Sequence, residues 1–308
     1  NKGSLKEHMA LIKVPTKNPS RFLILPSEND KKYIILLDDV IRYCLTDIFS
    51  NFGYDTFNAY TIKFTRDAEL ELDTDVSKSF LEIISNSLKQ RKEGAPVRFI
   101  YDNSMPPDVL DKIKRKLKIS KSDTMTQGGR YHNFKDFMHF PNIGNKDLEY
   151  ESLPPLSHPD LQGNTSIIRV IRHRDILLHY PYQSFQYIID LLREASIDPK
   201  VKSIHTTIYR VARNSSVMNA LINAARNGKK VTVFMELQAR FDEETNIYWT
   251  TRLQEEGVNT VNSIPGFKVH SKLLLIGRLE NRKMAYYANV STGNFNEQTA
   301  RVYADDSL

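Results

Sequence analysis

The residues best suited to chemistry are a histidine and a lysine two positions apart, His270 and Lys272, in Val269-His-Ser-Lys-Leu-Leu-Leu-Ile276. The apolar run predicts a strand over residues 269–276, and alternate side chains of a strand share a face. The two side chains would then point the same way, placing a nucleophilic imidazole beside a cation. On this segment alone, a core histidine with a lysine extending to solvent is an equally good interpretation.

A small polar loop follows the same region, Ser291-Thr-Gly-Asn-Phe-Asn296. Its hydroxyl side chains, its glycine and its two amides, Asn294 and Asn296, are typical of a tight loop that offers hydrogen-bond donors to an oxyanion. Such loops are common, so the segment is informative only together with His270.

Two arginines follow predicted strands in the same half of the chain. Arg210 ends the strand expected over 201–211, and Arg240 lies just beyond the one expected over 231–237. Ligands of parallel α/β sheets bind beyond the carboxyl ends of the strands, where an arginine fork can hold phosphate oxygens. Surface salt bridges are the alternative, especially for Arg240 with its acidic neighbours.

The elements that would position these residues alternate between strand and helix. Apolar periodicity predicts helices over 182–195, 217–227 and 243–256, and strands over 201–211, 231–237, 258–264, 269–276 and 284–290. This order predicts an α/β domain with a mostly parallel sheet covered by helices on both faces. The last two strands are expected to form an antiparallel hairpin.

The first half of the chain has a mixed order, and we expect an α+β domain there. Residues 33–49 begin with an apolar stretch and are expected to become helical, with Leu37, Ile41, Cys44 and Ile48 on one stripe. A second helix is predicted over 75–92, a strand over 96–101, and a basic amphipathic helix from Pro107. The Pro-rich stretch 153–159 has the composition of a linker. The predicted domains are therefore residues 1–150 and 158–308.

The bulk composition is that of a globular protein. The chain has 308 residues, more than one core usually holds, and no apolar run approaches the roughly 18 residues of a membrane-spanning helix. The net charge of +6 suits a polyanionic partner. A single cysteine, Cys44, cannot form an internal disulfide, so we expect a cytoplasmic protein, with association at the inner membrane face left open.

A His-x-Lys pair followed by a Gly-Asn loop is typical of the phospholipase D-like fold. The hydrolases of that fold carry an Asp five residues after the Lys, where this chain has Gly277. Longer strings resemble the bacterial polyphosphate kinase family, in order and over nearly the whole chain. They are Leu36-Leu-Asp-Asp39, Phe64-Thr-Arg-Asp-Ala-Glu69, Gly128-Gly-Arg-Tyr-His-Asn-Phe-Lys-Asp-Phe137, Ile208-Tyr-Arg-Val-Ala212, Asn227-Gly-Lys-Lys-Val-Thr-Val233, Glu236-Leu-Gln-Ala-Arg-Phe-Asp-Glu-Glu244, Gly266-Phe-Lys-Val-His-Ser-Lys272 and Ser291-Thr-Gly-Asn-Phe-Asn-Glu-Gln-Thr-Ala-Arg301.

The resemblance implies a role for each part of the chain. Residues 1–150 correspond to the family's head domain, and residues 158–308 to the first of two phospholipase D-like catalytic domains. His270 would be the phosphohistidine nucleophile, with Lys272 beside it. Arg210 and Arg240 would lie near Mg²⁺ through shared phosphate oxygens, because a guanidinium has no lone pair to give a metal. The remaining implied contacts are Tyr303 with ATP, and Asn294, Asn296 and Arg130 with phosphate.

The implied activity is reversible transfer of the ATP γ-phosphate to inorganic polyphosphate, with ATP, ADP and polyphosphate as ligands, Mg²⁺ as cofactor and no nucleic-acid partner. A dimer through the head domain is expected, and residues 1–308 alone, without a second catalytic domain, are expected to be inactive. Two alternatives stay open. They are a phospholipase D-like phosphodiesterase, which Gly277 disfavours, and a polyanion-binding module without turnover.

Overall fold

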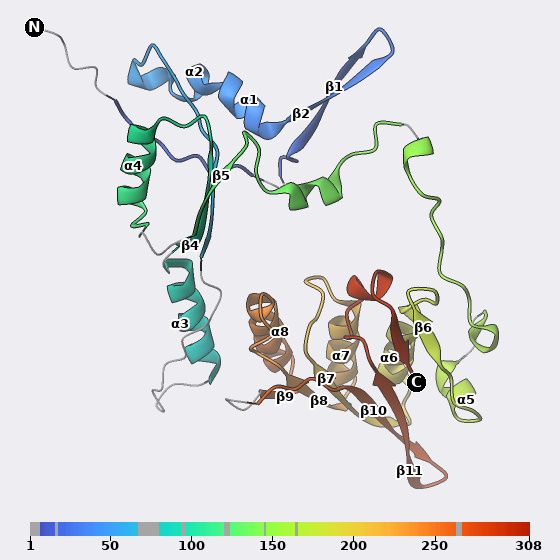
Figure 1. The fold of residues 1–308 in the computed structure, drawn as a ribbon. Helices are drawn as coiled ribbons and strands as arrows, with labels where there is room; N and C mark the ends of the chain where they lie inside the picture. Colours follow the sequence, from blue (N-terminus) through green and yellow to red (C-terminus); the bar gives the residue numbers. More distant parts are fainter. Residues whose placement is uncertain are drawn as a thin grey trace, which may run out of the picture. The chain divides into compact units, whose positions relative to one another are not determined.

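The structure is a computed structural model that describes residues 7–15, 18–66, 80–93, 96–119, 124–144, 146–163, 166–262 and 267–308. Figure 1 shows the fold. Contacts divide the chain into two compact units, one of residues 1–67 and 94–151 and the other of residues 68–93 and 152–308. Among the described residues, no helix is long and apolar enough to cross a membrane.

The first unit begins with a hairpin that the sequence did not predict. Strands β1 (Phe22–Glu28) and β2 (Lys31–Leu36) pair in antiparallel fashion, with Phe22 opposite Leu36. Asn29 and Asp30 form the turn with positive φ angles, as hairpin turns require. The apolar start of segment 33–49 therefore pairs as a strand, and the helical part expected after it is confirmed, although it is divided at Cys44. Helices α1 (Leu37–Tyr43) and α2 (Leu45–Ile48) follow.

A three-stranded sheet completes the first unit. Strand β4 (Pro96–Asp102) lies between β3 (Ile62–Arg66), which is antiparallel to it, and β5 (Thr124–Gly128), which is parallel. Helix α4 (Pro107–Lys116) forms the crossover between β4 and β5. The strand and the basic helix predicted here are confirmed. Short 3-10 helices occupy Ser50–Phe52, Phe134–His139 and Lys146–Leu148.

The second unit contains a seven-stranded sheet in the order β6-β12-β11-β10-β7-β8-β9. The strands are β6 (Leu178–Tyr180), β7 (Val201–Ile208), β8 (Lys230–Met235), β9 (Asn259–Asn262), β10 (Lys272–Glu280), β11 (Lys283–Ser291) and β12 (Asp305–Ser307). Only β7, β8 and β9 pair in parallel, and the other four neighbouring pairs are antiparallel. The prediction of a mostly parallel sheet is therefore wrong. The β10–β11 hairpin pairs with β7 in antiparallel fashion, and β12 and β6 continue the sheet beyond it with further antiparallel pairs.

The described residues of the second unit form the helices α3 (Phe80–Glu93), α5 (Ile167–Ile171), α6 (Gln186–Ile197), α7 (Ser216–Arg226) and α8 (Glu243–Glu255). Further 3-10 helices span Pro159–Leu161 and Thr299–Arg301. Helix α3, expected in the first domain, instead packs on α8, and its Ile84 and Leu88 join the apolar core of this unit. The part of α3 predicted over 75–79 lies outside the described residues.

The described helices lie unevenly about this sheet. In Figure 1, α6, α7 and α8 lie on one side of it. On the β10–β11 hairpin, the side chains of Leu273, Met284, Tyr286 and Val290 are exposed. Within the described residues, the expected cover on the second face is therefore absent over this hairpin.

Candidate functional site

The site lies where β7 and β8 end and β10 begins. Because β10 runs antiparallel to β7, with Leu274 opposite Thr206, the first residues of β10 lie beside the last residues of β7. The side chain of Asn246 on α8 fixes the strand ends by donating to the carbonyls of Tyr209 (2.9 Å) and Glu236 (2.7 Å). Asn246 is fully buried, so its side chain ties the ends of β7 and β8 to helix α8 away from solvent.

Three of the predicted site residues meet at one aromatic ring, that of Tyr209. The His270 imidazole packs against it edge to face, with 5.1 Å between ring centroids. The Lys272 ammonium lies 5.3 Å from the ring centroid and the Arg210 guanidinium carbon 5.4 Å from it. The structure therefore brings a nucleophilic side chain and two cations together, with a tyrosine between them that the sequence analysis did not single out.

The backbone around His270 is not part of the strand. Strand β10 begins at Lys272, so the strand predicted over 269–276 starts too early. Side chains hold the preceding segment instead. The Thr207 hydroxyl donates to the carbonyl of Ser271 (2.6 Å) and accepts from the amide of Leu273 (3.0 Å). The fully buried carboxylate of Glu236 accepts from the amide of Val269 (2.8 Å).

His270 and Lys272 differ in exposure. The imidazole is exposed, whereas Lys272 is only 5% exposed and donates a hydrogen bond to the carbonyl of His270. Burial lowers the pKa of Lys272, the nearby Arg210 lowers it further, and the Asp305 carboxylate opposes both effects. The pair thus combines an accessible imidazole with a largely desolvated ammonium group, which is hydrogen-bonded to the backbone carbonyl of the same histidine.

The two arginines are held in different ways. Arg210 binds the Asp242 carboxylate and donates to the carbonyl of Arg240 at 3.0 Å. The Arg240 guanidinium is exposed and lies over the ring of Phe241, 5.2 Å from its centroid. Of the acidic neighbours, Asp242 thus pairs with Arg210, whereas Arg240 has no acidic partner among the described residues.

The polar loop after β11 is organised around Asp305. The amide of Gly293 donates to the Ser291 hydroxyl (3.1 Å), and the Thr292 hydroxyl donates to the Asp305 carboxylate (2.9 Å). That carboxylate lies so close to Gly293 that a Cβ atom there would be 2.5 Å from it. The Asp305 carboxylate thus lies near the Lys272 ammonium. The sequence analysis assigned no role to Asp305, although it is only two residues from Tyr303.

The two asparagines of this loop have different surroundings. The Asn296 carboxamide oxygen accepts from the amides of Gln298 (3.0 Å) and Thr299 (3.3 Å), so it stabilises the following 3-10 turn. The buried oxygen of Asn294 has no hydrogen-bond partner in the described structure. Tyr303, between that turn and β12, is 59% exposed.

Arg130 lies in the first unit, where its guanidinium binds Asp39 through two hydrogen bonds of 3.1 and 2.6 Å. Asp39 also accepts from the hydroxyl of Tyr131 and from Arg42. Partial burial raises the pKa of Asp39, but these hydrogen bonds outweigh it and hold that pKa below its usual value.

A similar but buried interaction lies nearby in the same unit. The Arg21 guanidinium donates to both carboxylate oxygens of Asp38 (3.0 and 3.1 Å) and to the carboxylate of Asp136 (2.7 Å). Segments 36–39 and 128–137 of the first unit thus bind each other, directly and through Arg21.

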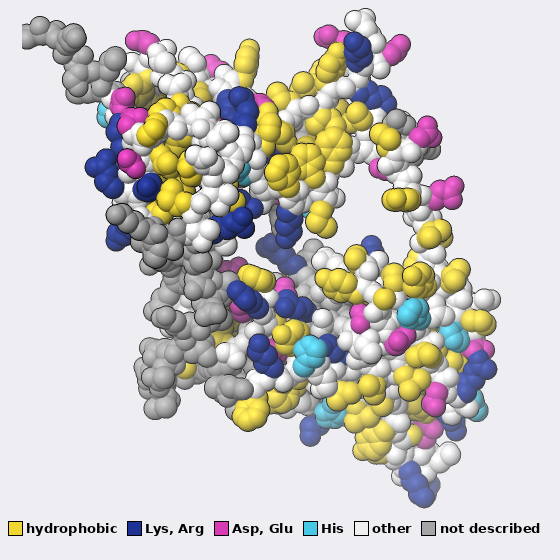
Figure 2. All heavy atoms as spheres, viewed as in Figure 1, with side chains coloured by type: hydrophobic (Ala, Val, Ile, Leu, Met, Phe, Trp, Pro, Cys, Tyr) yellow, Lys and Arg dark blue, Asp and Glu magenta, His cyan; other side chains and the backbone are white. Residues whose placement is uncertain are grey.

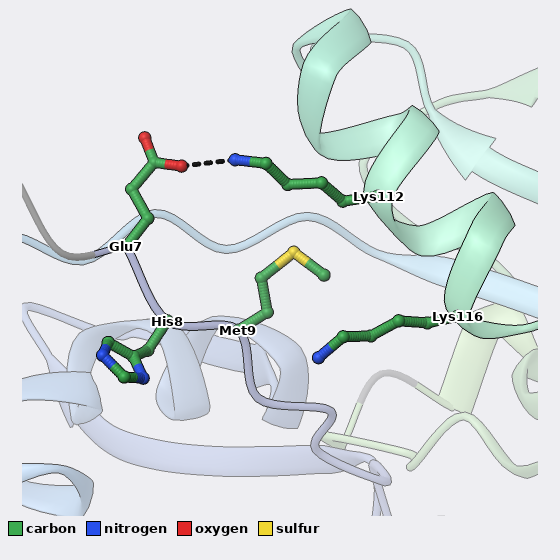
Figure 3. Close-up of a pocket in the computed structure, with 5 residues that line it drawn as sticks. All are labelled: Glu7, His8, Met9, Lys112 and Lys116. Atoms are coloured by element: carbon green, nitrogen blue, oxygen red, sulfur yellow. Dashed lines mark hydrogen bonds and ion pairs between the residues drawn. The ribbon is translucent and has the colours of Figure 1, made fainter.

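A hollow of about 250 Å³ lies in the first unit, between the N-terminal segment and α4 (Figure 3). It is lined by Glu7, His8, Met9, Lys112 and Lys116. Lys112 pairs with Glu7 there, and the lining residues are at the surface. None of the predicted site residues borders this hollow. Among the described residues of the whole chain, no cluster of three His, Cys, Asp or Glu side chains could hold a metal ion.

Comparison with known families covers both units. Residues 1–140 match the family described as "Polyphosphate kinase middle domain", and residues 166–308 match "Polyphosphate kinase C-terminal domain 1".

Individual relatives agree with this match. The chain is 53% identical to "Polyphosphate kinase" of Vibrio vulnificus (strain YJ016) over 97% of this chain and 43% of that protein. It is 50% identical to "Polyphosphate kinase" of Escherichia coli (strain K12) over 97% of this chain and 44% of that protein. The crystal structure of polyphosphate kinase from Porphyromonas gingivalis superposes with a TM-score of 0.70 at 38% identity, covering 96% of this chain and 42% of that one. The chain thus spans less than half the length of these relatives.

Proposed function

Because the chain belongs to the polyphosphate kinase family, we propose that its protein transfers the γ-phosphate of ATP reversibly to inorganic polyphosphate through a phosphohistidine at His270. The observation that supports this role is the exposed imidazole of His270, packed on a ring that also contacts two cations. We also propose that the second unit, with its mixed sheet, is phospholipase D-like and is the catalytic domain.

The proposed reaction has two balanced steps. An imidazole nitrogen of His270 attacks the γ-phosphorus, and the bond from that phosphorus to the bridging oxygen of ADP breaks. A terminal oxygen of polyphosphate then attacks the phosphohistidine, which lengthens the polymer and frees the imidazole. Phosphoryl transfer depends mainly on positioning and on cations near the phosphoryl oxygens. Arg210 and Lys272, at the same ring as His270, are suited to that task.

Further contacts are proposed for residues around this centre. The Arg240 guanidinium, which has no acidic partner among the described residues, suits phosphate binding. Asn294 would donate to phosphate through its amide nitrogen, and the exposed ring of Tyr303 suits contact with ATP. Arg130 is a weaker candidate, because its guanidinium already binds Asp39. Asn296 would donate to phosphate through its amide nitrogen, since its oxygen accepts from the following turn. Mg²⁺ is proposed as the cofactor, near Arg210 and Arg240 through phosphate oxygens that the metal and the guanidinium groups share. We further propose a dimer formed by the first unit, and a cytoplasmic location.

The test is labelling of the full-length protein with γ-radiolabelled ATP and Mg²⁺. We expect a label that is stable in alkali and lost in acid, as a nitrogen–phosphorus bond requires, and that His270→Ala abolishes. His173→Ala, which changes another exposed histidine of the same unit, is the matched control and should label normally. Unchanged labelling of His270→Ala would rule out the nucleophile. Binding of polyphosphate without any label would favour the non-catalytic alternative.

A further inference from the structure

We propose that Tyr209 is a positioning residue, whose ring orients the His270 imidazole and holds the Arg210 and Lys272 cations around it. This inference rests on the proposed function, because it assigns a role within the same phosphoryl-transfer site. The Tyr209 ring contacts the nucleophile and both cations, but in this proposal it does not react with the substrate.

The first argument is that the His270 side chain has little else to orient it. Within the described part of the chain, its imidazole has no hydrogen-bond partner, and it packs edge to face on the ring of Tyr209. His179 of the same unit shows the contrast, because its Nδ1 atom lies 2.6 Å from a carboxylate oxygen of Asp306. An exposed imidazole without such a partner can turn about its side-chain bonds unless a neighbouring ring restricts it.

The second argument concerns the two cations. Arg210 and Lys272 carry like charges, and each lies within 5.4 Å of the centre of the same ring. The negative face of an aromatic ring attracts cations, and the attraction is stronger where water is excluded. Lys272 is nearly buried, so the ring provides a favourable contact where solvent is largely absent. Tyr209 thus helps two cations remain close before the phosphate arrives.

The third argument is that Tyr209 is itself fixed. Its carbonyl accepts from Asn246, which is fully buried and also bonds the end of β8. The His270 segment is attached to the same strand ends through Thr207 and Glu236. The ring and the imidazole are therefore held from a common support, which is the arrangement that preorganisation requires.

The phenol oxygen has no hydrogen-bond partner among the described residues, so the ring and not the hydroxyl should matter. In the full-length protein, we expect Tyr209→Phe to form phosphohistidine within about threefold of the wild-type rate, and Tyr209→Leu to be at least about tenfold slower. The KM for ATP should change by less than about threefold in both, because the loss falls on the chemical step. Tyr286→Leu, which removes an exposed tyrosine from β11, should label at the wild-type rate.

Two further measurements remain informative if Tyr209→Leu folds poorly. Pentafluorophenylalanine at position 209 keeps the ring's size but reverses the charge of its face, and should also slow labelling by about tenfold. In proton NMR spectra, the ring-current shift of the His270 imidazole should persist in Tyr209→Phe and disappear in Tyr209→Leu.

The outcomes separate the two proposals. If the label survives in His270→Ala, the proposed function has failed, whatever Tyr209 does. If the label requires His270 but forms at the wild-type rate in both the leucine and the pentafluorophenylalanine variants, the positioning role of Tyr209 is wrong. Slow labelling in Tyr209→Phe would likewise overturn it, since the hydroxyl would then carry the effect.

Discussion

At the scale of single residues, Arg210 shows why the type of cation matters at this site. Its planar group binds the Asp242 carboxylate, donates to the carbonyl of Arg240 and lies over the Tyr209 ring. A lysine ammonium carries the same charge but cannot present donors in a fixed plane. The shape of the guanidinium is therefore part of how it is anchored.

We expect Arg210→Lys to lower kcat/KM of the full-length protein by about 10- to 100-fold, roughly 1.4–2.8 kcal/mol of transition-state stabilisation. Steady-state kinetics with ATP and a polyphosphate primer measure this. Arg226→Lys is the matched control, because Arg226 also binds a carboxylate, that of Glu256, but on the surface of α7. Equal turnover of both lysine variants would contradict the assignment.

Tyr303 gives a second prediction at this scale. Because its ring is mostly exposed, Tyr303→Ala should lower the melting temperature little, whereas it should raise the KM for ATP more than the KM for polyphosphate. Substrate titrations and a thermal melt separate these effects. A large loss of stability with an unchanged KM for ATP would show that Tyr303 packs and does not bind.

At the scale of elements, the loop after β11 and strand β12 depend on each other. The absence of a side chain at Gly293 lets the Asp305 carboxylate approach, and Asp305 in turn accepts from Thr292 and opposes the burial effect on the Lys272 ammonium. Gly293 does not have a positive φ angle, so the requirement for glycine here is space.

Gly293→Ala should therefore destabilise the protein by about 1–3 kcal/mol, because the new methyl group would displace Asp305. Denaturant unfolding measures the loss. Gly129→Ala is the control, since a Cβ atom there meets nothing within 4 Å. Adding Asp305→Gly, which also removes the Asp305 Cβ atom 2.7 Å from the new methyl group, should remove most of the penalty of Gly293→Ala. Additive losses in the double variant would show that the two residues do not compete for space.

At the scale of the whole molecule, the first unit carries an exposed apolar surface that could mediate association. Figure 2 shows hydrophobic side chains gathered over the β1–β2 hairpin. This hairpin patch consists of Ile24 and the adjacent rings of Phe134, Phe137 and Phe140, on the face of β1 that also carries Phe22. Aromatic rings in a contiguous exposed patch are typical of an interface between proteins.

We expect the full-length protein to sediment at twice its monomer mass, and the pair of changes Ile24→Ser and Phe134→Ser to weaken this association at least about tenfold, or 1.4 kcal/mol. Analytical ultracentrifugation over a concentration series measures it. Tyr43→Ser, at an exposed position of the first unit outside the patch, should have no effect. A dimer unaffected by the patch variants would place the interface elsewhere.

Local patterns predicted much of this molecule. The 3.6-residue periodicity of 217–227 and 243–256 predicted α7 and α8 to within one residue at each end, because apolar residues on those helices face one core. The β10–β11 hairpin was also predicted. The sequence left the conformation of the apolar stretch 33–36 open, because its residues suit a strand and a helix alike, and only pairing with β1 decides between them.

The sequence by itself determined the chemical types at the candidate site and the family to which the chain belongs, because both reside in short strings such as Val269–Lys272. It could not show that strand β10 begins only at Lys272, or that Thr207 and Glu236 hold the preceding segment by their side chains. It also gave no reason to choose Tyr209 or Asp305. Those contacts join residues far apart in the chain, and only the packing of α8 and β10 against the ends of β7 and β8 brings them together.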